Sequence, residues 1–261
     1  MTTTLNLPPI IGHRGSADLA PENTLAGIRR AHREGAAFVE FDVKLSADNI
    51  PILMHDDRVD RTTGGKGKVA AKTLDEIQTL DAGAWFSTEF EGERVPTFKA
   101  ALELCIELGL GVNVELKPCP GRDEETAKIA LGLLEEVWLH DQTLPTPLIS
   151  SFDPPALAAA QKFAPNLPRG CLFTRIPWKW QAAFEQYGCS TLNLSNRWVR
   201  QKHVEAADAR GAPVLVYTVN DPKRAKTLWA MGVTSIFTDR VDLMVEALGR
   251  KTNISSGRQT L

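Results

Sequence analysis

The chain has 261 residues, of which 43% are hydrophobic and 24% are charged, and its formal net charge is −2. This balance is ordinary for a globular protein and argues against a nucleic-acid surface or a polybasic membrane patch. Residues 1–9 lack a basic region and a long apolar run, so we expect no signal peptide. No stretch approaches the roughly 20 apolar residues of a transmembrane anchor.

The amino-terminal segment alternates between strand and helix patterns. An apolar run at residues 9–12 predicts a short strand that leads directly into the His-Arg-Gly sequence at 13–15. A helical pattern follows and continues through Glu34, and either Asn23 or Thr24 is a suitable N-cap for it.

Residues 38–43 predict a buried strand that carries two acids. Apolar residues alternate with Glu40 and Asp42, and this period of two places both carboxylates on one face, roughly 7 Å apart. Acids so placed repel each other and lose hydration unless a cation or a cluster of donors lies between them. The alternative is an exposed strand with an outward polar face. The helix–Gly–strand connection at residues 34–36 favours a buried parallel strand, so we predict a metal ion held by oxygen ligands.

A second apolar run, at residues 50–54, follows the strand after a short turn and ends at His55 and Asp56. A parallel crossover needs a dozen or more residues, which this connection does not have. We therefore predict an antiparallel hairpin that rises above the sheet and brings His55 over the carboxylates.

Residues 57–96 differ in character and predict an insertion or lid after the second strand. The block is too short to bury a core of its own, so we do not expect a separate domain. It contains a polar, glycine-rich loop and a short helix whose start is marked by Thr73 and Glu76, a capping-box pattern. Trp85 follows in the same block.

A regular strand–helix rhythm returns at Thr97 and continues to Leu248. The predicted strands of this part are at 111–117, 147–151, 169–173, 191–194, 213–219 and 235–238. The helices are predicted at 97–108, 123–139, 154–163, 178–187, 200–210, 221–231 and 239–248. Without the hairpin arm, this gives eight strands, each followed by a helix.

This count and the chain length predict an α/β fold, a (β/α)₈ TIM barrel formed by residues 1–249 as a single domain. A doubly wound open sheet is the alternative, but the first strand–helix turn lacks a GxGxxG sequence. Residues 250–261 are polar and unpatterned, and we expect a disordered tail.

In a (β/α)₈ barrel the carboxyl ends of all strands form one rim, and catalytic residues lie there. The predicted barrel therefore brings several polar residues of this chain together at that rim. The residues expected there are His13, Arg14, Glu40, Asp42, His55, Glu115 and Lys117. A metal on the three acids would neutralise a phosphoryl oxygen, the Arg and Lys would hold the others, and the two histidines would exchange protons. Taken singly, each residue also has an ordinary structural explanation, such as a loop histidine or a structural ion pair.

These residues, together with several short motifs elsewhere in the chain, resemble the glycerophosphodiester phosphodiesterase family. The matching segments cover residues 9–248: His13-Arg14-Gly15, Pro21-Glu22-Asn23-Thr24, Glu40-Phe41-Asp42-Val43, His55-Asp56, Glu115-Leu116-Lys117, Ser150-Ser151-Phe152, Tyr217-Thr218-Val219-Asn220 and Thr238-Asp239. The resemblance implies a TIM barrel with a small inserted segment, as the pattern itself predicts.

The resemblance also implies an activity and a role for each matching residue. Members of the family hydrolyse glycerophosphodiesters to sn-glycerol 3-phosphate and an alcohol with a divalent cation, Mg²⁺ or Ca²⁺. The implied roles are acid/base catalysis for His13 and His55, metal binding for Glu40, Asp42 and Glu115, and phosphate binding for Arg14 and Lys117. The sequence does not indicate which histidine is the acid and which is the base. The attacking group is either the glycerol 2-hydroxyl or water. Glu22 or Asp239 is open to a partly redundant catalytic role.

One position departs from the family pattern. Tyr217 stands where family members commonly have Trp, so the alcohol or glycerol pocket keeps an aromatic wall but gains a hydroxyl. Phe152 and Trp85 are the other candidates to line that pocket, and ordinary core or lid packing is the alternative for both.

Two other functions compete with this interpretation. One is a lysophospholipase D-type phosphodiesterase, and the other is a barrel that binds a phosphorylated ligand without catalysis. We expect a small-molecule substrate, no nucleic acid and no membrane anchor, and a homodimer is compatible with the sequence. The four cysteines, Cys105, Cys119, Cys171 and Cys189, form no CxxC pair, so we expect reduced thiols and a cytoplasmic location.

Overall fold

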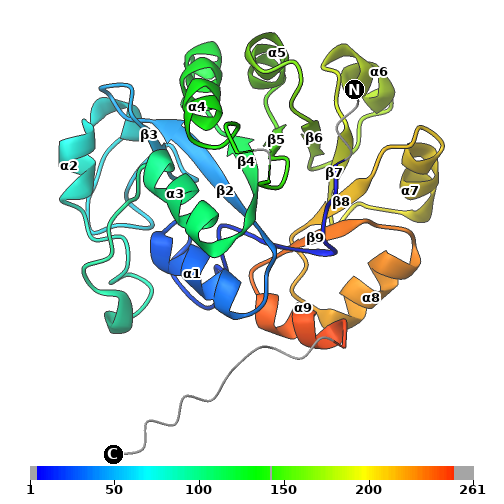
Figure 1. The fold of residues 1–261 in the computed structure, drawn as a ribbon, viewed down its shortest axis with the longest axis horizontal. Coiled ribbons are helices and arrows are strands. Elements are labelled where there is room, and N and C mark those ends of the chain that lie inside the picture. Colours follow the sequence, from blue (N-terminus) through cyan, green and yellow to red (C-terminus); the bar gives the residue numbers. More distant parts are fainter. Residues whose placement is uncertain (1–4, 142, 250–261) are drawn as a thin grey trace, which may run out of the picture.

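The computed structural model describes residues 5–141 and 143–249, and it confirms the predicted (β/α)₈ barrel (Figure 1). The strands are β1 (Ile10–Gly12), β2 (Phe38–Leu45), β3 (Pro51–Leu53), β4 (Gly111–Leu116), β5 (Leu148–Ser151), β6 (Arg169–Phe173), β7 (Thr191–Ser195), β8 (Val214–Tyr217) and β9 (Ser235–Thr238). All except β3 are parallel to their neighbours and form the barrel wall. The expected tail, residues 250–261, lies outside the described residues.

Helices cover the outside of the barrel. They are α1 (Leu25–Arg33), α3 (Phe98–Leu108), α4 (Asp123–Val137), α5 (Pro154–Phe163), α6 (Trp180–Gln186), α7 (Gln201–Asp208), α8 (Pro222–Ala230) and α9 (Val241–Ala247). A further helix, α2 (Leu74–Gln78), belongs to the insertion. Thr24 and Thr73 accept backbone hydrogen bonds at the starts of α1 and α2, and the capping box with Glu76 forms as predicted. None of the described helices has the length and apolarity needed to cross a bilayer.

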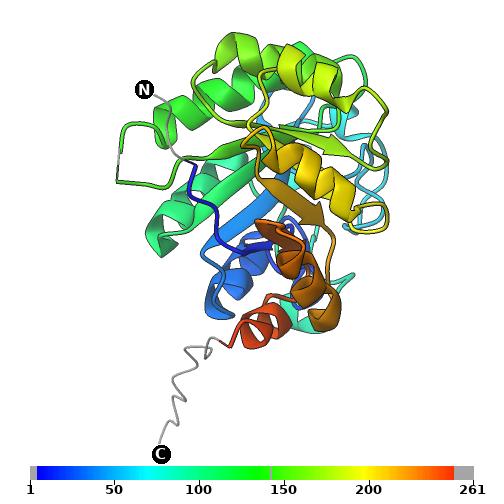
Figure 2. The same cartoon turned by 90° about the vertical axis from the view of Figure 1, so that its right-hand side faces the viewer.

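The barrel closes between its first strand and the strands on either side. β1 pairs with β9, where Gly12 lies opposite Thr238, and also with β2, where Gly12 lies opposite Val39. This closure places residues from the two ends of the chain side by side, and the view in Figure 2 shows the same arrangement from the side. Since the eight strands run in one direction, their carboxyl ends form a single rim.

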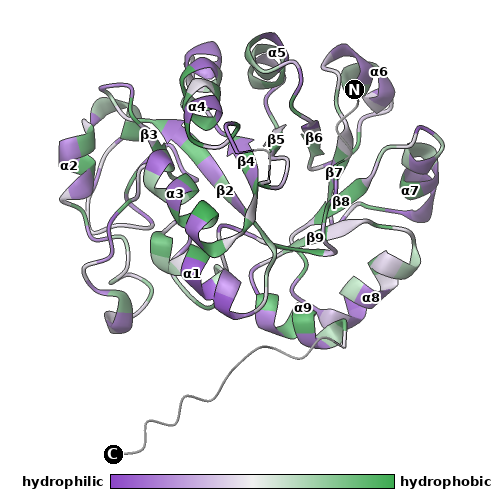
Figure 3. Cartoon of the chain, in the orientation of Figure 1, coloured by the Kyte–Doolittle hydropathy of each residue, from purple (hydrophilic) through white to green (hydrophobic). Residues whose placement is uncertain are grey.

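Hydrophobic side chains fill the space between the strands and the helices. β2 is buried along its whole length, and Phe41 packs edge-on against Phe98 of α3 with ring centroids 5.9 Å apart. The hydropathy colours in Figure 3 show polar bands between apolar ones on β2, which mark the alternation read from the sequence. The polar residues of β2 therefore point into the barrel, while its apolar residues pack outward against helices.

The predicted hairpin and insertion are both present. β2 pairs antiparallel with β3, with Val43 opposite Leu53, and the insertion continues from there at one side of the barrel (Figure 1). It contains the 3₁₀ helices η1 (Val69–Ala71) and η2 (Thr88–Phe90) as well as α2. Its small apolar cluster includes Ile52 of β3 and Cys119 outside the insertion, so the block packs against the barrel.

The prediction of four reduced thiols was wrong for two of them. Cys171 of β6 and Cys189, two positions before β7, form a disulfide, whereas Cys105 and Cys119 are free and buried. The two bonded cysteines lie 18 positions apart and meet because β6 and β7 are neighbours in the barrel. Reduced thiols were one argument for a cytoplasmic location, which stays a prediction.

Candidate active site

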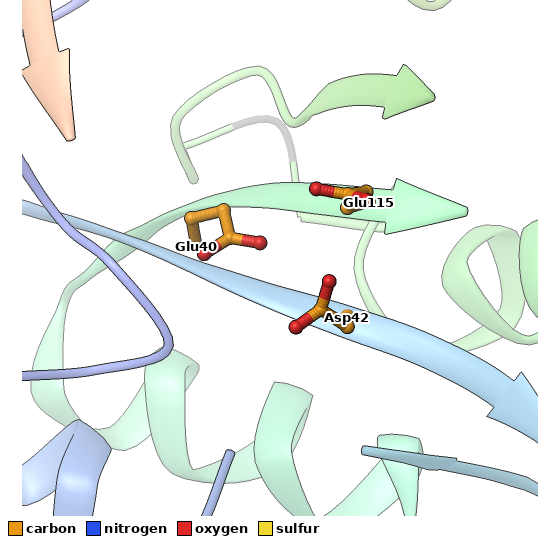
Figure 4. A group of neighbouring side chains, drawn as sticks. All are labelled: Glu40, Asp42 and Glu115. Carbon is orange, nitrogen blue, oxygen red and sulfur yellow. The ribbon is translucent and has the colours of Figure 1, made fainter. Parts of the chain in front are cut away.

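Three carboxylates meet inside the barrel at the carboxyl ends of two adjacent strands. Glu40 and Asp42 come from β2 and Glu115 from β4, where Asp42 lies directly opposite Glu115. One oxygen of each residue lies within 4.8 Å of the others, and the three side chains point toward one another in Figure 4. Their residues are 3%, 1% and 8% exposed, respectively, so the predicted buried strand is confirmed and the alternative, an exposed strand with an outward polar face, is excluded.

The turn after β1 brings the backbone to this cluster. Arg14 adopts a left-handed conformation with φ of 49°, and its backbone N–H donates to Glu40 Oε2 over 2.9 Å. Gly15 follows with φ of 88°, and a Cβ at this position would overlap the backbone of Gly27 in α1. The close approach of this turn to α1 thus requires glycine at position 15.

Positive groups surround Asp42 on several sides. Arg14 Nε lies 3.2 Å from Asp42 Oδ2, and Asn23 Nδ2 donates to the same oxygen over 2.9 Å. Lys117 Nζ donates to Glu115 Oε1 over 2.8 Å and lies 3.5 Å from Asp42 Oδ1. Asp42 therefore holds both predicted phosphate-binding cations at the centre of the site.

The three carboxyl groups differ in how readily they ionise. Burial and the negative charge of Asp42 raise the pKa of Glu40 to about 8 and raise the pKa of Glu115 as well. Burial alone would raise the pKa of Asp42, but the charges of Arg14 and Lys117 hold it well below its usual range. The cluster thus resists carrying its full negative charge until a cation offsets the repulsion.

These residues fit a divalent cation. Glu40 Oε1 and Asp42 Oδ1 are buried oxygens without a hydrogen-bond partner in the described part of the chain. Burying such atoms is costly unless a donor or cation satisfies them. Carboxylate oxygens are the ligands that Mg²⁺ and Ca²⁺ prefer.

Each predicted catalytic histidine is held by an aspartate. His13 Nδ1 lies 2.6 Å from Asp239 Oδ1, and Asn220 Nδ2 donates to the other oxygen of Asp239 over 2.7 Å. His55 Nδ1 lies 2.7 Å from Asp56 Oδ1. Because a carboxylate accepts, Nδ1 of both rings carries the proton, and Nε2 is the nitrogen available to a ligand.

A network of ion pairs connects Asp56, which holds His55, to the turn after β1 that carries His13 and Arg14. Arg61 of the insertion donates to both oxygens of Glu22 over 2.7 and 2.8 Å and to both oxygens of Asp56 over 2.8 and 3.0 Å. Glu22 also accepts from Arg14 over 2.8 Å. Arg61 therefore links the partner of His55 to the partner of Arg14.

The two histidines have opposite shifts in pKa. Burial disfavours the charged ring of His13, but the hydrogen bond with Asp239 and the charge of Glu40 outweigh it and raise the pKa. Burial lowers the pKa of His55, and the charge of Arg14 adds to that effect against the opposing charge of Asp42. The site thus holds two imidazoles of different basicity.

A cavity of about 150 Å³ opens at this rim, and all the predicted site residues except Asp42 and Trp85 line it. Asp42 does not line the cavity, but it contacts Arg14 and Lys117, which do. Phe152 and Tyr217 form an aromatic wall with ring centroids 5.5 Å apart, and Lys117 Nζ lies 5.4 Å from the Phe152 centroid. Trp85 packs against Phe86 in the insertion, and the structure does not bring it to the cavity.

The contacts that hold the two histidines were not predicted from the sequence, although Asp239 was named there as a possible redundant catalytic residue. Asp239 and Asn220 follow barrel strands and occur in matched family segments, so their place at strand ends was the available signal. Asp56 could have been proposed as a partner of His55 because it follows His55 in the sequence. No sequence pattern indicated a role for Arg61, which lies in a polar loop of the insertion.

Comparison with known proteins identifies the family. The model of the glycerophosphoryl diester phosphodiesterase family matches residues 13–243. A glycerophosphodiester phosphodiesterase of Caldanaerobacter subterraneus subsp. tengcongensis is 32% identical over 243 residues, covering 90% of this chain and 96% of that protein.

Solved structures agree with this match. An Oleispira antarctica phosphodiesterase in complex with the product sn-glycerol-3-phosphate is 39% identical, with a TM-score of 0.90 over 93% of this chain and 97% of that one. A glycerophosphodiester phosphodiesterase from Agrobacterium tumefaciens is 32% identical, with a TM-score of 0.77 over 92% and 100%. The conserved fold, the buried acids and the extent of these matches lead to one conclusion: this chain belongs to the glycerophosphoryl diester phosphodiesterase family.

Proposed function

We propose that this enzyme hydrolyses small glycerophosphodiesters to sn-glycerol 3-phosphate and an alcohol, with a divalent cation bound to Glu40, Asp42 and Glu115. The observation that carries the proposal is the cavity in which two aspartate-held histidines meet a buried acid cluster and two cations. The complex of the Oleispira antarctica relative with sn-glycerol-3-phosphate supports the same product class.

Substrate binding follows from the charges that line the cavity. Arg14 and Lys117 hold the phosphate oxygens, since a guanidinium and an ammonium pair readily with phosphate. When bound, the cation supplies positive charge beside the phosphoryl group and offsets the charge that develops there. The glycerol moiety packs against Phe152 and Tyr217, which line one wall.

His13 and His55 exchange the protons of the reaction. One ring takes the proton of the attacking hydroxyl, and the other gives a proton to the alcohol oxygen as the phosphorus–oxygen bond breaks. The attacking group is either the glycerol 2-hydroxyl, which gives a cyclic phosphate that water then opens, or water itself. Asp239 and Asp56 keep each ring in the tautomer that presents Nε2.

Replacing either histidine tests this proposal. His13→Ala and His55→Ala should each lower kcat for glycerophosphocholine by roughly 100-fold or more, because each removes one proton-transfer step. Release of glycerol 3-phosphate is the measurement, and His140→Ala, at an exposed position, is the control. Turnover near that of the unmodified enzyme in either variant would remove that histidine from the mechanism.

A further inference from the structure

Two neighbouring loops at the rim of the barrel have an unusual composition. They join β6 to α6 and β7 to α7, and we define the cationic rim as residues 174–179 and 196–202, of which the last two begin α7. Its five cations are Arg175, Lys179, Arg197, Arg200 and Lys202, and it contains no Asp or Glu. None of the five makes an ion pair with any residue in the ranges 5–141 and 143–249.

Trp178 projects from the first of these loops. Its residue is 92% exposed, whereas the other exposed large apolar residues of the described chain lie between 36% and 39%. A large aromatic side chain left almost entirely in water costs free energy that burial would recover. Exposure of this kind at a defined position points to an interaction surface.

Cation–aromatic contacts tie the two loops together. The guanidinium carbon of Arg175 lies 4.3 Å from the ring centroid of Trp198, and that of Arg197 lies 5.3 Å from it. The positive field extends into α7, where burial and the charges of Lys202 and Arg200 lower the pKa of His203. The cationic rim is therefore one patch and not two unrelated loops.

This patch is continuous with the wall of the catalytic cavity. Leu172 of β6 lines the cavity, two positions before the first loop begins. Asn196 begins the second loop, and its backbone N–H donates to the carbonyl of Tyr217 over 2.6 Å. Tyr217 itself lines the cavity, so a surface that binds the cationic rim lies beside the cavity mouth.

We propose that the cationic rim docks this enzyme on an anionic phospholipid surface, with Trp178 entering the headgroup layer. Tryptophan is enriched at membrane–water interfaces, where its ring sits at headgroup level. Lysine and arginine near such a surface are attracted by its anionic lipids. A single-stranded polynucleotide stacks successive bases on several aromatic side chains, whereas Trp178 alone among the large apolar residues of the described chain is exposed beyond 39%. The patch therefore favours a lipid surface over a polynucleotide.

When the cationic rim and Trp178 contact the membrane, the cavity mouth would face the layer of phospholipid headgroups. These headgroups carry the same glycerol phosphodiester chemistry as the proposed substrates. The inference does not depend on the proposed reaction, since binding to lipid is measured without turnover.

Vesicle sedimentation tests the proposal with the full chain. We expect binding to phosphatidylcholine vesicles that contain phosphatidylglycerol, weaker binding as salt rises, and little binding to phosphatidylcholine alone. Trp178→Ala should lower the partition coefficient roughly tenfold or more, and Arg175→Gln with Lys179→Gln roughly fivefold for each charge removed. Thermal melts establish that the variants are folded.

Matched controls lie on α4 and just after it. Leu139→Ala removes another exposed apolar side chain, and Lys128→Gln removes another exposed cation, and both should bind vesicles as the unmodified protein does. The proposal is overturned if the protein fails to sediment with anionic vesicles at low salt, or if Trp178→Ala binds equally well. It is also overturned if the variants instead abolish binding to single-stranded RNA or dissociate a dimer of this chain.

Discussion

At the scale of single residues, the site depends on contacts between side chains far apart in the sequence. His13 and Asp239 are separated by 226 positions and meet because β1 pairs with β9. Glu40 and Asp42 were predictable, since a spacing of two on a strand fixes a common face. The contact between His13 and Asp239 was not predictable, because no local sequence pattern indicates which residue an aspartate in a loop will contact.

Arg61 illustrates a residue whose role only the folded chain reveals. Arg61→Ala should lower kcat roughly tenfold or more, because Asp56 and Glu22 lose their shared partner and the groups they hold, His55 and Arg14, shift. Lysine at this position should restore only part of the activity, since it lacks the planar fork that binds both carboxylates.

Kinetics of these variants are the appropriate measurement, with kcat and KM determined separately. Arg58→Ala is the matched control, because Arg58 belongs to the same insertion and its only ion pair in the described part of the chain is an exposed one with Asp60. An Arg61→Ala enzyme with unchanged kcat would show that the link to Glu22 and Asp56 has no positioning role.

At the scale of elements, the strands and helices were largely predictable. A period of two identified β2, and apolar runs in a strand–helix rhythm identified the other strands. The N-cap of α1 was predicted as Asn23 or Thr24 and that of α2 as Thr73, and Thr24 and Thr73 are the caps that form. The short connection before β3 required an antiparallel hairpin, which forms. The Cys171–Cys189 disulfide was missed because its sequence spacing matches no motif and the pairing follows from strand order alone.

The contact between the starts of α4 and α5 gives a prediction for stability. Burial, a hydrogen bond and the negative charge of Asp123 raise the pKa of Asp153 to about 6. An acid whose pKa is raised by folding binds its proton more tightly in the folded state. Stability from this group is therefore greatest below its unfolded pKa and falls as the pH rises to about 6.

Asp153→Asn should accordingly stabilise the protein at pH 7 and change it little at pH 4. The gain is at most about 1 kcal/mol, or roughly 2–4 °C in Tm, because solvent screens this half-buried group. Thermal melts at the two pH values are the measurement. An equal change at both pH values, or a loss at pH 7, would contradict the like-charge explanation.

At the scale of the whole molecule, barrel closure assembles the site. It collects residues in or just after β1, β2, β4, β5, β6, β8 and β9, together with His55 of the hairpin arm, around one cavity. The repeated strand–helix pattern was enough to predict this convergence. Net charge, by contrast, averages over the surface, so the whole-chain value of −2 gave no sign of the cationic rim.

The metal dependence of this enzyme is measured as release of glycerol 3-phosphate from glycerophosphocholine by metal-depleted protein. We predict that activity disappears after EDTA treatment and returns with Mg²⁺, Mn²⁺ or Ca²⁺, because Glu40, Asp42 and Glu115 form a buried oxygen site. Asp42→Asn should require more metal while remaining folded. Full activity in the metal-depleted enzyme would contradict a cation at this site, as would no activity with any of the three ions.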